Sequence, residues 1–182
     1  MICCTHLDSP LGGITLAGEG DSLTGLWFDG QKHFAAGLSE KAPQRSLPVF
    51  AETERWLALY FQGVEPDFTP PLRLIGTPFQ REVWALLRQI PYGSTVSYAA
   101  LAARIAEGRG LARFSAQAVG GAVSRNPISI LVPCHRVLGA DGSLTGYAGG
   151  LQKKAALLRL EGVALPPWDS RRDGSDNRKE FC

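Results

Sequence analysis

The strongest constraint on the fold of this chain is a break near residue 70, where both composition and charge change. Residues 66–71 contain three prolines, which interrupt regular structure because proline fixes φ and lacks a backbone N–H. Residues 1–70 carry four Lys/Arg against nine Asp/Glu, a net charge of −5, whereas residues 71–165 carry eleven against four, a net charge of +7. We therefore expect an acidic domain over 1–70, a basic domain over 71–165 and a disordered tail over 166–182.

The 182 residues suffice for one domain or two small ones, and the overall charge of +2 conceals the basic half. No apolar run approaches the roughly 20 residues of a membrane span. The first residues have neither a basic leader nor an apolar signal segment, which predicts a cytoplasmic protein with reduced thiols. A basic domain favours a polyanionic partner such as DNA, although scattered solvated charge explains the same numbers.

Two apolar runs joined by a glycine-rich turn predict a β-hairpin in the acidic domain. The first run begins at Ile14, residues 18–21 read Gly-Glu-Gly-Asp, and the second run covers residues 23–28. A helix is expected from Pro48, since proline suits the first helical turn and apolar residues then recur at helical spacing until Gly63. A small antiparallel sheet with one helix is the expected fold.

The basic domain is predicted to be mainly helical. Thr77 and Pro78 form a helix start, and apolar residues recur at helical spacing as far as residue 90. Two further helices are expected at 94–105 and 112–124, and two short helices joined by a glycine-containing turn are typical of a helix-turn-helix. The apolar, β-branched run at 128–132 predicts a buried extended segment, and a last helix is expected at 152–161.

The predicted helix at 112–124 has two distinct faces. Four residues at helical spacing share an inward face: Ala116, Val119, Gly120 and Val123. Four others share an outward face with little bulk: Arg113, Gln117, Gly121 and Ser124. Such a face allows the helix to approach the wall of a DNA groove closely, and it equally allows close packing against another helix.

Of the four cysteines, only Cys134 has neighbours that suggest thiol chemistry, because His135 and Arg136 follow it directly. Pro133 disfavours a regular helix here, so a working Cys–His pair needs an irregular turn or a bridging water. A cysteine after a buried apolar run is also an ordinary inert core residue, with its pKa raised by burial. The residues alone leave both interpretations open.

Five motifs occur in order within a match that spans about residues 77–162: Ala118-Val119-Gly120-Gly121, Asn126-Pro127, Pro133-Cys134-His135-Arg136-Val137, Gly146-Tyr147-Ala148-Gly149-Gly150 and Leu157-Leu158-Arg159-Leu160-Glu161-Gly162. Together they closely resemble the O6-alkylguanine-DNA alkyltransferase family, and residues 7–12 resemble its opening strand. Linked motifs in register are far more specific than a lone Pro-Cys. The resemblance implies an α+β fold: a small RNase H-like antiparallel sheet with a helix, then a mainly helical, winged-helix-like catalytic domain.

The resemblance implies single-turnover DNA repair without a cofactor. The Cys134 thiolate would attack the alkyl carbon on guanine O6 and keep the alkyl group as an irreversible thioether. His135 would take the thiol proton through water, Glu161 would orient His135, and Asn126 would stabilise the turn that shapes the site. Tyr98 would donate a hydrogen bond near N3 of the departing guanine.

The resemblance also implies a monomer that docks on the minor groove of double-stranded DNA and flips out the alkylated base. The expected pocket residues are Val137, Tyr147 and Ala148, with Lys154 supporting the loop. The expected DNA contacts are Arg113, Gln117, Ala118, Gly121, Ser124, Arg125 and Arg136. Gln117 stands where many members have an arginine that fills the vacated stack, which makes the efficiency of flipping a point to test.

Some members of the family bind zinc through two Cys and two His in the N-terminal domain. Here Cys3 and Cys4 are adjacent, and only His6 and His33 are close in sequence, so no metal is expected.

Three other functions fit these residues less well than alkyl transfer does. A non-catalytic protein that binds alkylated DNA would lack the nucleophilic cysteine, a thiol hydrolase would need a remote histidine, and a helix-turn-helix regulator would leave Cys134, His135 and Glu161 without a role. Reaction with O4-alkylthymine and the preferred alkyl group stay open at this point.

Overall fold

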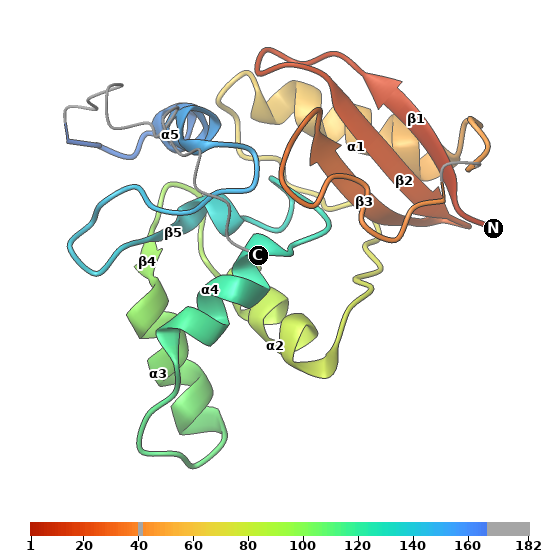
Figure 1. Cartoon of the computed structure of the whole chain (residues 1–182). Helices are drawn as coiled ribbons and strands as arrows, with labels where there is room; N and C mark the ends of the chain where they lie inside the picture. The colour runs from red at the N-terminus through yellow and green to blue at the C-terminus, as the bar shows by residue number, and fades with distance from the viewer. Residues whose placement is uncertain (40–41, 167–182) are drawn as a thin grey trace.

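The structure is a computed structural model that describes residues 1–39 and 42–166. Its N-terminal part is a three-stranded antiparallel sheet with the order β1 (Cys3–Leu7), β2 (Ile14–Glu19), β3 (Ser22–Phe28). The helix α1 (Pro48–Tyr60) packs against β2 and β3 (Figure 1). The predicted hairpin is the β2–β3 pair, and the predicted helix start at Pro48 is correct.

The opening strand lies earlier than residues 7–12. It ends at Leu7 because Ser9 and Gly12 exchange backbone hydrogen bonds of 3.0 and 3.1 Å and close a turn. Gly12 takes a positive φ of 106° there, a conformation that glycine adopts at little steric cost.

The C-terminal part is mainly helical. Its elements are α2 (Pro78–Leu87), β4 (Val96–Ser97), α3 (Tyr98–Gly108), α4 (Ala116–Ser124), the 3-10 turn η1 (Cys134–Arg136), β5 (Val137–Leu138) and α5 (Leu151–Leu160). The predicted Thr77 cap is present as a full capping box with Gln80, which satisfies two backbone N–H groups at the start of α2. An antiparallel sheet with a helix, followed by a helical domain, confirms the predicted α+β class.

Two helix starts were predicted several residues too early. Ser97, not Ser94, caps α3, because residues 96–97 are extended and pair in parallel with residues 137–138. Ser115 caps α4, its hydroxyl accepting a hydrogen bond of 3.1 Å from the backbone of Ala118. In both places a serine oxygen that satisfies a free N–H decides the boundary more than helical periodicity does.

The extended segment predicted at 128–132 is wrong. Only Ile128 forms a bridge, with Leu26 of β3, and the chain then turns back, so that the backbone N–H of Val132 donates to the carbonyl of Ile128 at 3.1 Å. Ile130 holds a positive φ of 69° in this buried turn. A short apolar run satisfies a buried turn as well as a strand, and periodicity does not separate the two.

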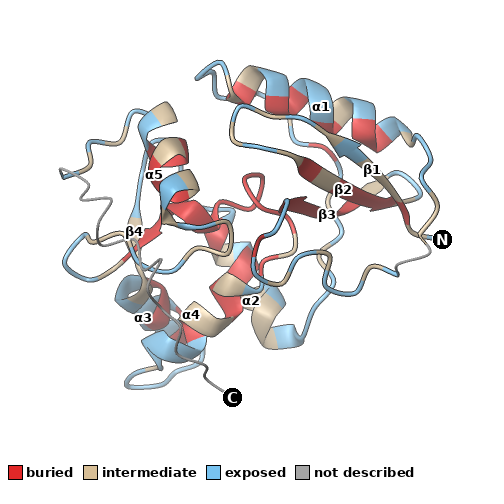
Figure 2. Cartoon of the chain, turned by 45° about the horizontal axis from the view of Figure 1, so that its top comes forward, coloured by how far each residue is buried: buried red, intermediate tan, exposed pale blue. Residues whose placement is uncertain are grey.

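A continuous hydrophobic cluster joins the two parts. Leu16, Leu26 and Phe28 from the sheet belong to the same buried cluster as Trp84 and Ile128. Figure 2 shows buried residues on the strands β2 and β3 and on the helices α2 and α4. Backbone hydrogen bonds reinforce the contact, since the N–H of Leu26 donates to the carbonyl of Pro127 at 2.9 Å. The residues that lead to Cys134 are thus anchored on the edge of the N-terminal sheet.

Within the described ranges 1–39 and 42–166, no helix has the length and apolar character needed to cross a membrane. The tail predicted at 166–182 lies, except for residue 166, outside the described residues.

Candidate active site

Cys134 opens onto a pocket of about 410 Å³ between α4 and the loop that precedes α5. The pocket is lined by Tyr98, Ala116, Gln117, Gly120, Val123, Ser124, Cys134, Thr145, Gly146, Tyr147 and Ala148. Six of these residues are among the predicted site residues: Tyr98, Gln117, Ser124, Cys134, Tyr147 and Ala148. The structure therefore brings together residues from α3, α4, η1 and the loop, which are far apart in the chain.

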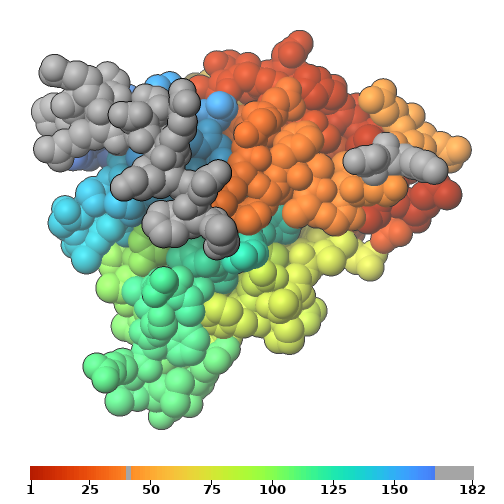
Figure 3. Space-filling view, in the orientation of Figure 1, coloured from red at the N-terminus to blue at the C-terminus, as the bar shows by residue number. Residues whose placement is uncertain are grey.

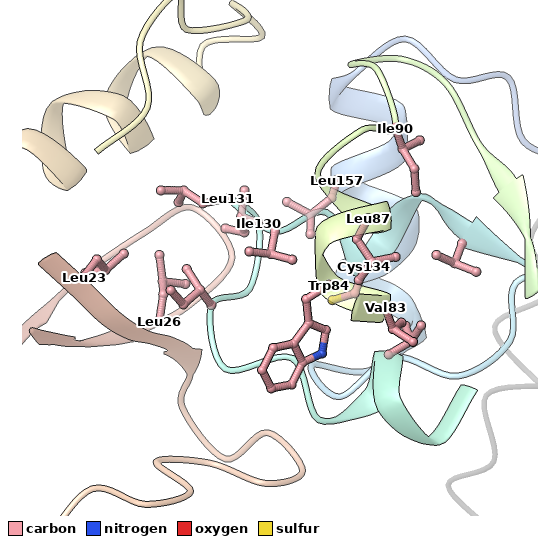
Figure 4. Packing of buried hydrophobic residues seen from close by; sticks show 14 of the residues in the cluster. Leu23, Leu26, Val83, Trp84, Leu87, Ile90, Ile130, Leu131, Cys134 and Leu157 are labelled. Atoms are coloured by element: carbon pink, nitrogen blue, oxygen red, sulfur yellow. The ribbon is translucent and has the colours of Figure 1, made fainter. Parts of the chain in front are cut away.

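The sulfur of Cys134 lies at the boundary between the pocket and the core. Cys134 is 5% exposed and belongs to the same buried cluster as Trp84 and Leu87 (Figure 4). Burial raises the pKa of the Cys134 thiol, while a hydrogen bond from Asn126 and the positive charge of Lys154 lower it. A nucleophile in this place needs a base to remove its proton.

Asn126 connects the turn to the thiol. Its Nδ2 donates to the carbonyl of Val132 at 2.7 Å and to Sγ of Cys134 at 3.2 Å, while its Oδ1 accepts from the backbone of Ile128 at 3.0 Å. The side chain is 4% exposed. Asn126 hydrogen-bonds to backbone groups of Ile128 and Val132 within the turn and to the thiol, so it links the turn to Cys134.

His135, the residue after the thiol, forms a buried pair with Glu161. Nε2 of His135 lies 2.6 Å from Oε1 of Glu161, and both side chains are 0% exposed. Although burial opposes ionisation, hydrogen bonds from His135, Arg136 and Tyr60 lower the pKa of Glu161 to about 2. Burial lowers the pKa of His135, which is therefore neutral at neutral pH.

The tautomer of His135 follows from these contacts. Glu161 is ionised and has no proton to give, so Nε2 of His135 must carry the proton and donate it. Nδ1 then carries the lone pair, and it has no hydrogen-bond partner among the described residues. A neutral imidazole with a free lone pair, on the residue that follows a buried thiol, has the protonation state that a general base requires.

The prediction that Arg136 contacts DNA is wrong. Arg136 is 9% exposed, its Nε donates to Oε2 of Glu161 at 2.8 Å, and its Nη1 donates to the carbonyl of Ile90 at 2.6 Å. The guanidinium is turned toward the buried carboxylate, since two opposite charges in the interior compensate each other. Its positive charge therefore compensates the buried carboxylate of Glu161.

Lys154 holds the loop over the pocket. Its Nζ donates to the carbonyls of Val137, Thr145 and Gly146, the last two at 2.7 and 3.2 Å. Lys154 is completely buried, and burial lowers its pKa to about 8, with the nearby Cys134 opposing the shift. Val137 is likewise buried in β5 and takes part through its backbone carbonyl rather than as a pocket wall.

Tyr98 reaches the same loop from α3. Its hydroxyl donates to the carbonyls of Thr145 and Gly146, each at 3.2 Å, and burial raises its pKa to about 12. The ring lines the pocket. Tyr98 is therefore placed to meet a ligand in the pocket, and it stays a protonated donor at neutral pH.

The residues predicted to contact DNA, apart from Arg136, lie on or beside α4. Arg113, Gln117, Ala118 and Arg125 are exposed, and Gly121 and Ser124 are half-buried. In the space-filling view, the green surface over α3 and α4 projects from the body beside the light blue loop (Figure 3). The open side of the pocket thus adjoins the exposed face of α4.

Sequence reasoning missed three groups. Tyr60 donates to Glu161 at 2.7 Å from α1, and the backbone of Gly93 donates to Oε2 of Glu161 at 3.1 Å. Thr145 supplies a loop carbonyl to both Lys154 and Tyr98. No local sequence pattern marks these three residues as part of the site. Tyr60 could have been considered as a candidate, because it is an aromatic residue with a polar hydroxyl at helical spacing from the apolar residues of its predicted helix.

Among the residues that the structure describes, no group of three or more His, Cys, Asp or Glu side chains is placed to hold a metal ion. His6 pairs instead with Asp29 at 2.9 Å on the surface.

The fold and site define a class of protein in which a buried cysteine, followed in the chain by the histidine of a buried His–Glu pair, lines a pocket beside the helices α3 and α4. Two family models cover almost the whole described chain. Residues 2–74 match the ribonuclease-like domain of 6-O-methylguanine DNA methyltransferase, and residues 78–163 match its DNA-binding domain. The chain belongs to the 6-O-methylguanine DNA methyltransferase family.

Curated relatives agree with this assignment. The methylated-DNA–protein-cysteine methyltransferase of Mycobacterium leprae is 45% identical over 161 residues, which cover 88% of this chain and 93% of the relative. The enzyme of the same name from Haemophilus influenzae is 41% identical over 160 residues, covering 87% and 86%.

Solved structures share the fold. A crystal structure of Mycobacterium tuberculosis OGT in complex with DNA has a TM-score of 0.75 and 43% identity, and the match covers 87% of this chain and 91% of that one. An O6-methylguanine DNA methyltransferase from Methanococcus jannaschii, 22% identical with a TM-score of 0.58 over 91% and 98%, supports the fold alone.

Proposed function

We propose that this protein repairs alkylated DNA by direct reversal, moving the alkyl group of O6-alkylguanine to Sγ of Cys134. The observation that carries the proposal is that Cys134 lines the pocket while the next residue, His135, is neutral and is paired with the buried carboxylate of Glu161. The family membership and the DNA-bound mycobacterial relative support DNA as the partner.

The residues account for each atom in the transfer. Nδ1 of His135 takes the thiol proton through a water molecule, and Asn126 and the charge of Lys154 stabilise the resulting thiolate. The thiolate attacks the alkyl carbon, so that an S–C bond forms as the C–O6 bond breaks. The guanine departs as an anion and is protonated, and Cys134 keeps a thioether. No step restores the thiol, so each molecule reacts once.

The pocket is suited to a base that has left the DNA stack. Its volume of about 410 Å³ and its small residues on α4, Ala116 and Gly120, leave room for a purine with its alkyl group. We propose that Tyr98 donates to N3 of the departing guanine, which develops negative charge. Tyr147 and Ala148 form the wall opposite α4.

We propose that the exposed face of α4 docks on the minor groove, and that Gln117 enters the stack where the base leaves. Gln117 is exposed and also lines the pocket, so one side chain faces both the DNA and the flipped base. Arg113 and Arg125 beside it supply charge to phosphates. The unbulky Gly121 and Ala118 allow close approach.

In this proposal residues 71–165 are the DNA-binding catalytic domain, residues 1–70 are its acidic companion, and the protein acts as a monomer. The reaction needs Cys134 as a free thiol, and Cys3, Cys4 and Cys134 are all free. We therefore place the protein in the reducing cytoplasm, where the DNA of its bacterial relatives lies.

The test is intact mass after incubation with duplex DNA containing O6-methylguanine. Replacing the thiol proton by methyl adds about 14 Da, and we expect this gain on the wild type and none on Cys134→Ala. Cys4→Ala is the matched control and should gain the same mass as the wild type. Tight binding without a mass gain would instead identify a non-catalytic binder of alkylated DNA, and a gain that survives Cys134→Ala would exclude the proposed nucleophile.

A further inference from the structure

The last residue of α1 reaches across the molecule to the base of the active site. The hydroxyl of Tyr60 donates to Oε1 of Glu161 at 2.7 Å and lies 3.3 Å from Nε2 of His135. Tyr60 and Glu161 are 101 positions apart, and Tyr60 belongs to the acidic part of the chain. The acidic domain therefore contributes a polar atom to the His–Glu pair.

Packing fixes the position of this hydroxyl. Tyr60 is completely buried, its ring stacks on Trp56 with centroids 5.1 Å apart, and the ring of Tyr92 meets it edge-on at 6.1 Å. His135 also meets the ring edge-on, at 6.5 Å. A ring enclosed on these sides has little freedom to move its hydroxyl away from the carboxylate.

The carboxylate oxygen is shared among three donors. Oε1 of Glu161 accepts from Tyr60, from Nε2 of His135 and, at 3.1 Å, from Nη2 of Arg136. Burial and the charge of Glu161 raise the pKa of Tyr60, so the phenol remains a neutral donor at every pH at which the protein works. A donor that never ionises gives the carboxylate a constant orientation.

We infer that Tyr60 is a positioning residue for alkyl transfer, whose hydroxyl holds Oε1 of Glu161 on Nε2 of His135 and so keeps the lone pair of the imidazole on Nδ1. The inference rests on the proposed role of His135 as the base. It assigns the acidic domain a part in the chemistry, because Tyr60 from α1 adds one hydrogen bond to the network that the catalytic domain forms around Glu161.

The titratable and charged groups around His135 and Glu161 influence the pH dependence of the transfer rate. Charged or titratable neighbours come from every element that packs here: Tyr60 from α1, Tyr92 before β4, Cys134 and Arg136 from η1, Tyr147 from the loop, and Lys154 and Glu161 from α5 and its end. Tyr60→Phe keeps every charge and the ring, and it removes one donor from Oε1.

The direction of the effect follows from that change. With one donor fewer, Glu161 becomes more basic and stabilises the imidazolium form of His135 more strongly. His135 then takes up a proton at higher pH, and a protonated His135 cannot act as the base. The low-pH limb of the transfer rate should therefore move upward, by about one pH unit, since the lost hydrogen bond is to a charged group.

The experiment compares full-length wild type, Tyr60→Phe and Tyr92→Phe in single-turnover alkyl transfer at saturating DNA, from about pH 5 to 9. For Tyr60→Phe we expect a rate about tenfold lower on the low-pH limb, where the limb has shifted upward, and unchanged affinity for DNA. Tyr92→Phe is the matched control, because it removes a neighbouring phenol whose hydroxyl donates to the carbonyl of Leu160 at 3.4 Å, and it should behave as the wild type.

Two results would overturn the inference. One is a Tyr60→Phe protein with the wild-type rate and the wild-type pH profile. The other is a loss of rate by the same factor at every pH, because a purely structural defect lowers the amplitude without moving the limb. Failure of the wild type to gain mass from O6-methylguanine DNA would instead contradict the proposed function itself.

Discussion

The carboxylate of Glu161 lies 2.6 Å from the imidazole of His135, although Glu161 follows the last residue of α5 and His135 lies in η1, 26 positions earlier in the chain. Glu161 occupies the C-cap of α5, where the helix dipole disfavours a negative charge. Three donor side chains compensate for that position: Tyr60, His135 and Arg136. A carboxylate kept in an unfavourable place with this many partners is well explained by a role in the reaction.

Glu161→Gln should abolish most of the alkyl transfer. The amide lacks the charge that stabilises the imidazolium of His135, and it leaves the buried Arg136 without its counter-charge. We expect a rate loss of about a hundredfold or more and a decrease in the free energy of unfolding of about 3 kcal/mol. Rapid-quench transfer assays and urea titrations measure the two effects. A fully active, equally stable variant would contradict this account of the pair.

Acid should destabilise the wild type more than Glu161→Gln. The pKa of Glu161 falls from an ordinary 4.5 to about 2 in the folded protein, so its ionised form contributes stability above pH 4.5 that is lost as the pH falls toward 2. The linked free energy is on the order of 3 kcal/mol. His135, whose pKa is lowered by burial, adds a loss that begins below its ordinary 6.5 in both proteins. Denaturant titrations between pH 4.5 and pH 2 should show a steeper fall in the free energy of unfolding for the wild type than for Glu161→Gln. Equal falls in the two proteins would refute the assignment.

Asn126→Ala should slow the transfer while DNA binding persists. The variant loses the hydrogen bonds to Sγ of Cys134 and to the carbonyl of Val132, and it leaves the N–H of Ile128 unsatisfied in the interior. Without that donor the pKa of the Cys134 thiol rises further. We expect a decrease in stability of about 2 kcal/mol and a rate at least tenfold lower. Fluorescence anisotropy with labelled duplex separates binding from chemistry, and an unchanged thiol titration would count against the role.

Gln117→Arg should raise the repair rate on duplex DNA severalfold. Gln117 is exposed at the first turn of α4 and borders the pocket, so the longer cation has room to enter the stack and to meet phosphate. The gain should disappear on a single-stranded substrate, where no stack needs filling. Single-turnover rates on the two substrates provide the measurement, and an equal gain on both would indicate a simple charge effect.

Local sequence signals predicted the parts of the fold that local chemistry decides. The hairpin follows from alternation around a glycine turn, and the start of α2 follows from the Thr77 capping box. The pocket residues Cys134 and Tyr147 were found because they lie in linked motifs, and Tyr98 because it matches a tyrosine of the family. The turn at 128–132 was not found, since a buried apolar run has the same appearance whether it is straight or folded back.

The sequence by itself determined the class of protein and the basic half of the chain, and it led to Cys134 as the proposed nucleophile, because these depend on residue type and order. Only the tertiary structure decided which partners the charged side chains contact. It turned Arg136 inward to Glu161 and brought Tyr60 to the same carboxylate from 101 positions away. The physical reason is that a buried charge is costly unless other groups hydrogen-bond to it or carry the opposite charge. Those groups come from whichever elements pack together in the core, and no local sequence pattern specifies them.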